Sequence, residues 1–356
     1  MHFADGEVPG EYLGYVHKKV LWLAGGMGVL LILLVYSISV GAVAIPLTDV
    51  FMTITGQNVS HKWDAIIWNI RLPQALAAIV AGCGLAVAGV TMQSILRNPL
   101  GSPFTLGISN AGAFGAAVSV IVLGTGTMQS RVADAVTINN PYITTMMAFL
   151  FCLLATAVIL LISRIRNASP EVMVLAGVAL SSLFTAGTMF LQYFSNDAQL
   201  AAVVFWTFGD VGRANWPELA FMSLIVAAAT VYFVVNRWNY NAIDAGDETA
   251  KSLGVNVERV RLFGMVASAL VTAVIVSFLG VIGFVGLVCP HMVRRIIGDD
   301  QRYLVPGSCI MGGILLLASD TVARVIIAPY VLPVAVLTAF MGAPIFIYLL
   351  LRGNRI

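Results

Sequence analysis

Few side chains in this sequence have the types and spacing that chemistry needs. Asp299 and Asp300 form a lone acidic pair, which is typical of a solvated turn and lacks the repeated aspartates that would hold magnesium diphosphate. His291 follows Pro290 at the end of an apolar run, where a single histidine is more often a helix-end group than a ligand. All four cysteines lie in or beside apolar stretches at no ligand-like spacing: Cys83, Cys152, Cys289 and Cys309. We therefore expect buried free thiols and no metal site.

The sequence also lacks the motifs of an energy source or an enzyme. No G-x-x-x-x-G-K-S/T loop is present to hold nucleotide phosphates, so any ATP and Mg²⁺ must bind to partner subunits. Neither an H-E-x-x-H zinc site nor a G-x-S-x-G serine elbow occurs. A proton- or ion-coupled carrier usually keeps acidic or histidine relays at bilayer depth, yet the apolar runs are almost free of charge. The sequence predicts no catalytic residue and no resident cofactor.

The composition places the chain in a membrane. Of its 356 residues, 59% are hydrophobic and only 10% are charged, and the mean hydropathy is +0.93. A helix needs about 20 apolar residues to cross a bilayer, and long uniform apolar runs exclude the alternating pattern of barrel strands. The net charge of +2 gives no reason to expect nucleic acid as a partner. We therefore predict an all-α membrane protein surrounded by lipid.

The apolar runs predict ten transmembrane helices. The run from 262 to 290 is longer than one ordinary span, is interrupted at Gly280 and Gly283, and has arginines at both ends. Because cytoplasmic loops collect Lys and Arg, both of its ends belong on one side, which requires two crossings with a short second one. The other eight predicted spans are residues 21–45, 71–96, 104–124, 142–163, 172–194, 216–236, 303–321 and 332–351. Residues 1–20 would form a cytoplasmic N-terminal segment and residues 21–356 a single membrane domain.

The distribution of positive charge predicts the orientation. With ten spans and a cytoplasmic N-terminus, 14 of the 19 Lys and Arg residues are cytoplasmic, and the five outside are Lys62, Arg71, Arg131, Arg213 and Arg324. We therefore predict that both termini are cytoplasmic and that the protein lies in the inner or plasma membrane. The apolar run 198–208 is too short to cross, which favours an interfacial or re-entrant helix on the outer side. Residues 46–70 would form a second outer segment.

Several segments, taken in order, resemble one family. They are "RLPQALAAIVAG", "AGVTMQSILRNPLGSPFTLGISNAGAFGA", "FWTFGDVGRANW", "AKSLGV" and "GFVGLVCPHMVRRIIGDDQRYLVPGS", followed by "ASDTVARVI" and "GAPIFIYLLLR". This ordered set, from about residue 30 to the C-terminus, resembles the FecCD-type permeases, which import iron-siderophores, haem and cobalamin. The resemblance implies the type II ABC importer permease fold, with ten helices in each permease.

The resemblance also implies an assembly. Two permeases would surround one central pathway, with two ATPase subunits beneath and a substrate-binding protein outside. A chain of 356 residues supplies one permease half, so the transporter would be a homodimer, or a heterodimer with a sister permease. A wide pathway lined by small, weakly polar groups suits a bulky metal chelate. We expect ferric siderophore first, with haem or cobalamin next, and oxyanions remain open. An ion-gradient-driven secondary transporter is the alternative, and an intramembrane enzyme is third.

A polar segment at about 237–258 separates the sixth and seventh spans on the predicted cytoplasmic side. Its stretch "NAIDAGDETAKSLGV" is compatible with a short amphipathic helix, in which Ala250 and Leu253 share one face and charged residues face water. From the residues alone, a solvated loop is the alternative. The family contacts its ATPase through this segment. By resemblance, the coupling residues are Asp247, Glu248, Ala250, Leu253, Gly254 and Val255.

Two arginines fall in motifs where the family receives acidic residues of a binding protein. Arg71 opens the second predicted span and Arg324 ends the ninth, both toward the predicted outer face. Charged rim pairs of this kind steer association and fix register. The alternative is snorkelling to the lipid headgroups. The family often has R-L-P-R, whereas this chain has Gln74, so one usual docking charge is missing or moved.

A cytoplasmic gate is implied by two further matches. Asn98 and Leu100 of "RNPLGSP" and Ser169 of "RNASPEV" match positions that narrow the inner mouth of the cobalamin member. The prolines and glycine of the first motif predict a non-helical elbow, which a membrane tolerates only where protein or water covers the backbone. In the second motif, Pro170 replaces a common hydroxyl residue.

Overall fold

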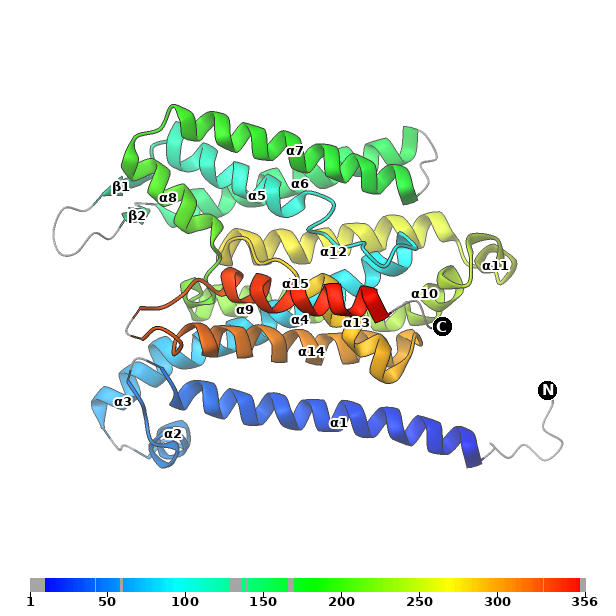
Figure 1. The fold of residues 1–356 in the computed structure, drawn as a ribbon, viewed down its shortest axis with the longest axis horizontal. Coiled ribbons are helices and arrows are strands. Elements are labelled where there is room, and N and C mark those ends of the chain that lie inside the picture. Colours follow the sequence, from blue (N-terminus) through cyan, green and yellow to red (C-terminus); the bar gives the residue numbers. More distant parts are fainter. Residues whose placement is uncertain are drawn as a thin grey trace.

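The helices of this protein lie side by side along one long axis (Figure 1). The computed structural model describes residues 10–41, 43–57, 60–128, 136–138, 140–165, 170–328 and 330–352. Helices α10 (Arg237–Asp244) and α11 (Asp247–Ser252) lie at one end of this axis, which we call the charged end. At the opposite end lie α2 (Leu47–Ile54), α3 (His61–Ile66) and α8 (Asp197–Thr207).

Seven helices in the described chain are long and apolar enough to cross a membrane. They are α1 (Gly10–Ser39), α4 (Leu72–Ile95, continuous with α3 and the π-helical turn η1, Ile67–Arg71), α6 (Pro141–Ile165), α7 (Pro170–Tyr193), α9 (Trp216–Val235), α12 (Val257–Leu279) and α14 (Gln301–Ala323). Three shorter ones are α5 (Ile108–Ala117, continued by η2, Val118–Val122), α13 (Val285–Ile297) and α15 (Val334–Arg352). Each predicted span thus coincides with a helix, while the count of ten crossings stays a prediction.

The long apolar run 262–290 is divided into two helices, α12 and α13, and its two crossings stay a prediction. Its backbone breaks between α12 and α13, where Gly280 and Phe284 have φ of 80° and 67°. Arg261 near the start of α12 donates to the Ile95 carbonyl at 2.9 Å, and Arg294 near the end of α13 donates to Gln93 at 3.1 Å. Both ends of the run therefore meet the same end of α4.

The short apolar run at 198–208 is helical, as the sequence predicts, and forms α8. Asn196 and Gln199 close its first turn by exchanging side chain to backbone hydrogen bonds of 2.9 and 3.2 Å. α8 packs beside a two-stranded antiparallel sheet, β1 (Gly126–Met128) and β2 (Val136–Ile138). This sheet is a small addition to the predicted all-α fold, and Arg131 lies outside the described residues.

Helix α4 is the centre of the packing. In its most apolar window 78% of the residues are buried, against 17% for α1 and 11% for α7. Glycines make this possible: a Cβ on Gly82 would collide with the backbone of Gly312 in α14, and one on Gly89 with that of Gly286 in α13. Without side chains between them the backbones approach closely, which is how membrane helices pack without a hydrophobic driving force.

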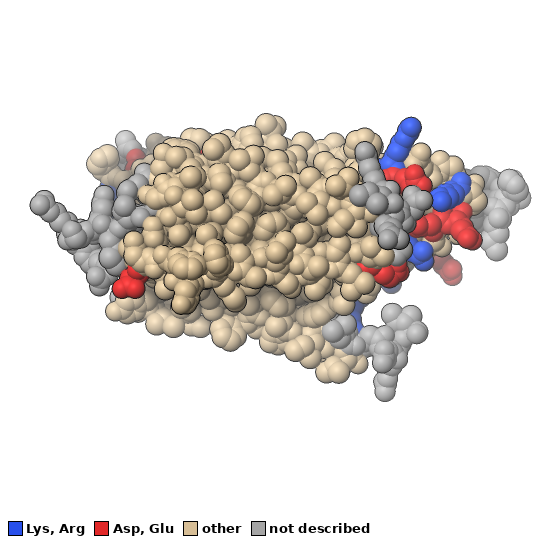
Figure 2. Space-filling view, turned by 90° about the horizontal axis from the view of Figure 1, so that it is seen from above, with Lys and Arg blue, Asp and Glu red and all other residues tan. Residues whose placement is uncertain are grey.

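Charged side chains are distributed unevenly along the axis. Figure 2 shows a long, uncharged middle and a concentration of Lys, Arg, Asp and Glu at the charged end. An uncharged band flanked by charged ends is what a bilayer requires of the surface that it covers.

Candidate functional site

The predicted gate elbow is the non-helical segment 96–107 between α4 and α5. Helix α4 ends at Ile95, and Arg97 has the left-handed φ of 45°. The Asn98 side chain accepts a hydrogen bond from the Leu100 backbone N–H at 2.9 Å, so Asn98 shapes the turn itself. Leu100 is 44% exposed. Of the two predicted gate residues in this elbow, Asn98 therefore shapes the turn and Leu100 has an exposed side chain, and the gate role of both stays a prediction.

Polar contacts hold the elbow in place. Ser102 and Thr105 exchange backbone to hydroxyl hydrogen bonds of 3.0 and 3.1 Å. His291 of α13 is 2.9 Å from the Pro99 carbonyl through its Nε2 atom. The sequence alone suggested only a helix-end role for this histidine. Its partner is 192 residues away, so no local pattern could have revealed the contact.

The second predicted gate position, Ser169, lies outside the described residues. Helix α7, which begins directly after it at Pro170, does reach the elbow. A Cβ on Gly177 of α7 would lie 2.7 Å from Cα of Leu106. The elbow thus packs against α7 as well as α13, and the gate role of Ser169 stays a prediction.

The predicted coupling segment forms two short helices at the charged end, α10 and α11. Ala250 is fully buried against Ile243 and Val257, whereas Leu253 is 68% exposed. The expectation that Ala250 and Leu253 share one face is therefore wrong. Helix α11 ends at Ser252 with Leu253 as its C-cap residue, and Gly254 then turns the chain with a φ of 82°.

Among the other residues of the coupling segment, some bind neighbouring helices and others are exposed. Asp247 accepts from Arg261 at 3.1 and 3.2 Å, and the same arginine reaches the end of α4. Glu248 is exposed and Val255 is half-buried. Gly254 has open space where a Cβ would stand. A hollow of about 360 Å³ at this point is lined by Lys251, Gly254, Val255, Asn256, Val257 and Glu258.

Arg71 and Arg324, the predicted docking residues, are buried at the opposite end of the molecule. They are 7% and 6% exposed. Arg71 donates to the carbonyls of Val40 and Val43, the second at 3.1 Å. Arg324 donates to the Val40 carbonyl at 3.1 Å and to the Ser37 hydroxyl at 2.6 Å. Both guanidinium groups therefore hold the chain at the end of α1, which is not the exposed placement that direct docking assumes.

An acidic residue completes this cluster. Asp320, 3% exposed, forms an ion pair of 3.0 Å with Arg324 and accepts from Gln74 at 2.9 Å. The glutamine that replaces the family's usual arginine is thus a neutral partner of a buried carboxylate. We call this cluster the arginine lock: Arg71, Arg324, Asp320, Gln74, Ser37 and the carbonyls of Val40 and Val43.

These elements define a class of protein. A bundle of apolar helices, with non-helical backbone packed inside it and an exposed charged end, is the architecture of a multi-pass membrane permease. The described residues contain no group of three or more His, Cys, Asp or Glu side chains that could hold a metal ion. Residues 29–352 match the model of the FecCD transport family, and the chain therefore belongs to that family.

Comparison with known proteins gives the same assignment. An ABC transporter permease protein of Methanocaldococcus jannaschii, provisionally so named, is 51% identical over 97% of this chain and 98% of its own length. The hemin transport system permease protein of Yersinia pestis is 37% identical over 92% of this chain and 96% of its own length. A solved structure of a provisionally assigned metal-chelate type ABC transporter, inward-facing, has a TM-score of 0.80 at 28% identity and covers 93% and 98% of the two chains.

The family fixes the kind of protein this is. The chain is the membrane permease subunit of an ABC importer of this family and not itself an enzyme, since the ATPase of such importers resides in partner subunits.

Proposed function

We propose that this chain forms one half of the pathway of an ATP-driven importer for a metal chelate, with ferric siderophore the first candidate and haem or cobalamin next. One observation supports this most directly. The exposed edge of the coupling segment, at Leu253 and Gly254, lies at the same end of the bundle as the gate elbow. Arg261 connects the two, because it binds Asp247 of α11 and the last carbonyl of α4, just before the elbow.

The two ends of the bundle would bind different partner proteins. Two ATPase subunits would bind the charged ends of two permeases, which are two copies of this chain or this chain and a sister. ATP and Mg²⁺ would belong to the ATPase subunits. The hollow beside Gly254 and Lys251 has room for a side chain of such a partner. The charged end would be cytoplasmic, together with both termini, because most Lys and Arg residues lie there.

A substrate-binding protein would dock at the opposite end. The arginine lock leaves Arg71 and Arg324 little capacity for a new ion pair, so we propose an indirect role for them. They fix the turn after α1 on which α2 and α3 are mounted, and the docking surface would be built on that turn.

Reconstitution tests the proposal. Proteoliposomes would contain the chain with the ATPase and binding protein encoded beside it, and would be offered a ferric siderophore, haem and cobalamin. We expect uptake of one chelate class that requires ATP, and no ATP hydrolysis by the chain alone. Uptake that follows an ion gradient and ignores ATP would instead identify a secondary transporter. Labelling of Leu253→Cys from outside sealed cells would overturn the orientation.

A further inference from the structure

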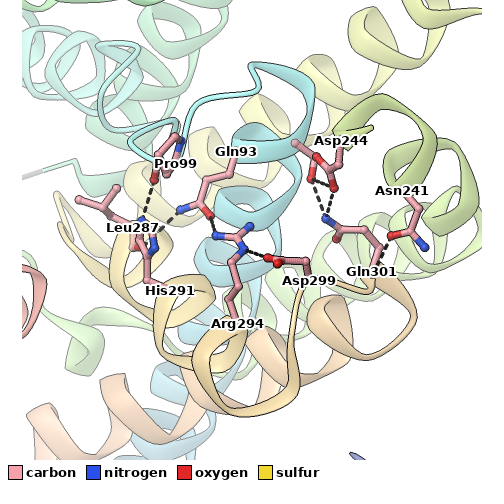
Figure 3. A network of polar contacts seen from close by, with 10 residues as sticks. Gln93, Pro99, Asn241, Asp244, Leu287, His291, Arg294, Asp299 and Gln301 are labelled. Carbon is pink, nitrogen blue, oxygen red and sulfur yellow. Dashed lines mark hydrogen bonds and ion pairs between the residues drawn. The ribbon is translucent and has the colours of Figure 1, made fainter. Parts of the chain in front are cut away.

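Two consecutive buried polar residues close α4 at the charged end. Gln93 and Ser94 are 3% and 1% exposed. Gln93 accepts from Arg294 at 3.1 Å and donates to the Leu287 carbonyl at 3.3 Å, both in α13. Figure 3 shows these contacts on one side of a polar network whose other side surrounds Gln301. Because successive helical residues point in different directions, the end of α4 faces two sets of partners.

The first arm of the network leads to the gate elbow. Arg294 forms an ion pair of 2.5 Å with Asp299, and one turn before it in α13, His291 contacts the Pro99 carbonyl. Helix α13 thus holds the end of α4 through Gln93 and the elbow through Pro99 (Figure 3). A displacement of α13 relative to α4 would change the position of the elbow.

The second arm leads to the coupling segment. Gln301, the first residue of α14, is 1% exposed and donates from Nε2 to the Ser94 hydroxyl at 2.7 Å and to Asp244 at 2.9 Å. Ser94 also donates to Asp244 at 3.2 Å. Asp244 is the last residue of α10, so these three side chains join α4, α14 and the coupling segment.

A further contact holds the start of α14 to α10. The Asn241 side chain accepts from the Gln301 backbone N–H at 2.9 Å and donates to Asp300 at 3.2 Å. Burial works against ionisation of Asp300, but hydrogen bonds from Arg302 and Asn241 outweigh it and lower the pKa of this carboxyl. Asp300 therefore stays charged and keeps α10 attached to the turn between α13 and α14.

One polar atom of the network has no hydrogen-bond partner among the described residues. The Gln301 side-chain carbonyl oxygen is buried without a hydrogen-bond partner in the described part of the chain. A buried polar atom in that state is costly, so the arrangement seen here leaves one acceptor available to a donor that moves toward it. The network is therefore suited to two alternative sets of hydrogen bonds.

We propose that Ser94, Gln301 and Asp244 are positioning residues that transmit movement of the coupling segment to the gate elbow through Gln93, Arg294 and His291. These six residues are called the relay below. This inference deepens the proposed function and rests on its ATP-driven coupling. Asp244 is exposed, whereas Ser94 and Gln301 are buried. Members of one hydrogen-bond network support one another, so displacement of Asp244 changes the partners of Ser94 and Gln301 together.

The test uses the reconstituted transporter with its ATPase and binding protein. Ser94→Ala and Gln301→Leu remove the hydrogen bonds of the second arm, which join α4 and α14 to Asp244 of the coupling segment, and Ser308→Ala is the matched control. Ser308 is also a fully buried serine, and its hydroxyl has no partner in the described chain. We expect the relay variants to hydrolyse ATP within about twofold of the parent while uptake per ATP falls about tenfold. The control should match the parent.

A reporter at the gate gives a second readout. Leu100→Cys is exposed in the elbow, and in the parent its rate of thiol labelling should change when ATP is added. In the Ser94→Ala and Gln301→Leu backgrounds that change should be lost. Asp244→Asn keeps the shape of the side chain but removes its charge and replaces one acceptor oxygen by an NH2 donor, so it serves if either relay variant assembles poorly.

Three outcomes in the Ser94→Ala and Gln301→Leu variants would overturn the inference. In assembled transporters, uptake and ATP hydrolysis could fall in the same proportion, or both could stay at parental values. The ATP-dependent change in labelling at Leu100→Cys could also survive. Failure of the proposed function is distinct, because the parent itself would then show no ATP-dependent uptake or labelling.

Discussion

The arginine lock and the relay are polar clusters at opposite ends of the same bundle, and they are built differently. The lock places two guanidinium groups on backbone carbonyls and adds a carboxylate, with Arg71, Arg324 and Asp320 all at 7% exposure or less. The relay joins a buried amide and a buried hydroxyl, Gln301 and Ser94, to the exposed carboxylate of Asp244. The ion pair that its member Arg294 forms with Asp299 is 25% and 79% exposed. The difference indicates that the end with the arginine lock is fixed, whereas the hydrogen bonds of the charged end can rearrange.

The energetic cost of breaking each cluster depends on how far water reaches its charged groups. Removing one partner of a buried ion pair costs about 3–5 kcal/mol, since the other charge is left uncompensated. A pair in contact with water is worth at most about 1 kcal/mol. Hydrogen bonds between neutral groups can be exchanged for others at little net cost, provided that a new partner is at hand. Rearrangement should therefore occur at the charged end before it occurs at the lock.

The largest effect on stability is expected at the lock. Arg324→Met leaves Asp320 buried and unpaired, so we expect the unfolding free energy to fall by about 3–5 kcal/mol. Thermal unfolding of the purified chain in detergent measures this. Adding Asp320→Asn should recover part of the loss, because the uncompensated charge is gone. Unchanged stability combined with weaker association of the binding protein would restore a direct docking role for Arg324.

A smaller loss is expected at the buried face of the coupling segment. Ala250→Leu adds three carbon atoms to a fully buried site between Ile243 and Val257. Overpacking of this kind costs about 1–3 kcal/mol. Hydrogen exchange should show α10 and α11 loosening while α4 and α14 stay protected. If α11 in Ala250→Leu is as protected from hydrogen exchange as in the parent, the pocket around Ala250 can expand. Ala250 then does not hold the coupling segment in place.

A still smaller change is expected at the exposed ion pair of the charged end. Asp299→Asn should lower stability by no more than about 1 kcal/mol, because water and salt already screen this carboxylate. The measured loss should shrink further at high salt. A loss as large as that of Arg324→Met would show that the two ends do not differ in the way we infer.

The smallest effect on stability is expected at Leu253. Leu253→Ser alters a side chain that is 68% exposed, so stability should stay within about 0.5 kcal/mol of the parent. If the ATPase covers this residue, association with the ATPase should weaken by roughly 1–2 kcal/mol in a co-purification titration. Glu258→Gln, on the rim of the same hollow, is the control for a general change of this surface. Equal association of both variants would place the ATPase contact elsewhere.

Much of the fold is predictable from the sequence because membrane spans leave a strong local signal. The run 262–290 could be divided in two from its length, its glycines and the arginines at both ends, and α8 from its shortness. The count of crossings is harder, since α5 and α13 are short and their depth depends on packing rather than on composition.

The candidate site was less predictable, for physical reasons. An arginine near the end of a span suggests an exposed rim, but the carbonyls that bury Arg324 lie 284 and 287 residues away in the sequence. Helical periodicity placed Ala250 and Leu253 together, but it does not show that α10 and α12 cover Ala250 and leave Leu253 exposed. The relay partners of Gln93 and Ser94 are also distant, and paired polar residues in an apolar helix were the one signal that could have pointed to them.

The glycine contact between α4 and α14 has a mechanical consequence. With backbone against backbone at Gly82 and Gly312, the two helices have no side chains there to deform, so their crossing can act as a pivot between them. Ile95 lies 13 residues beyond Gly82, or roughly 20 Å at the rise of an α-helix. A tilt of about 5° around that pivot would carry the end of α4 sideways by roughly 2 Å. That displacement is comparable to a hydrogen-bond length, so a small rotation of α4 relative to α14 is enough to exchange the partners of Ser94.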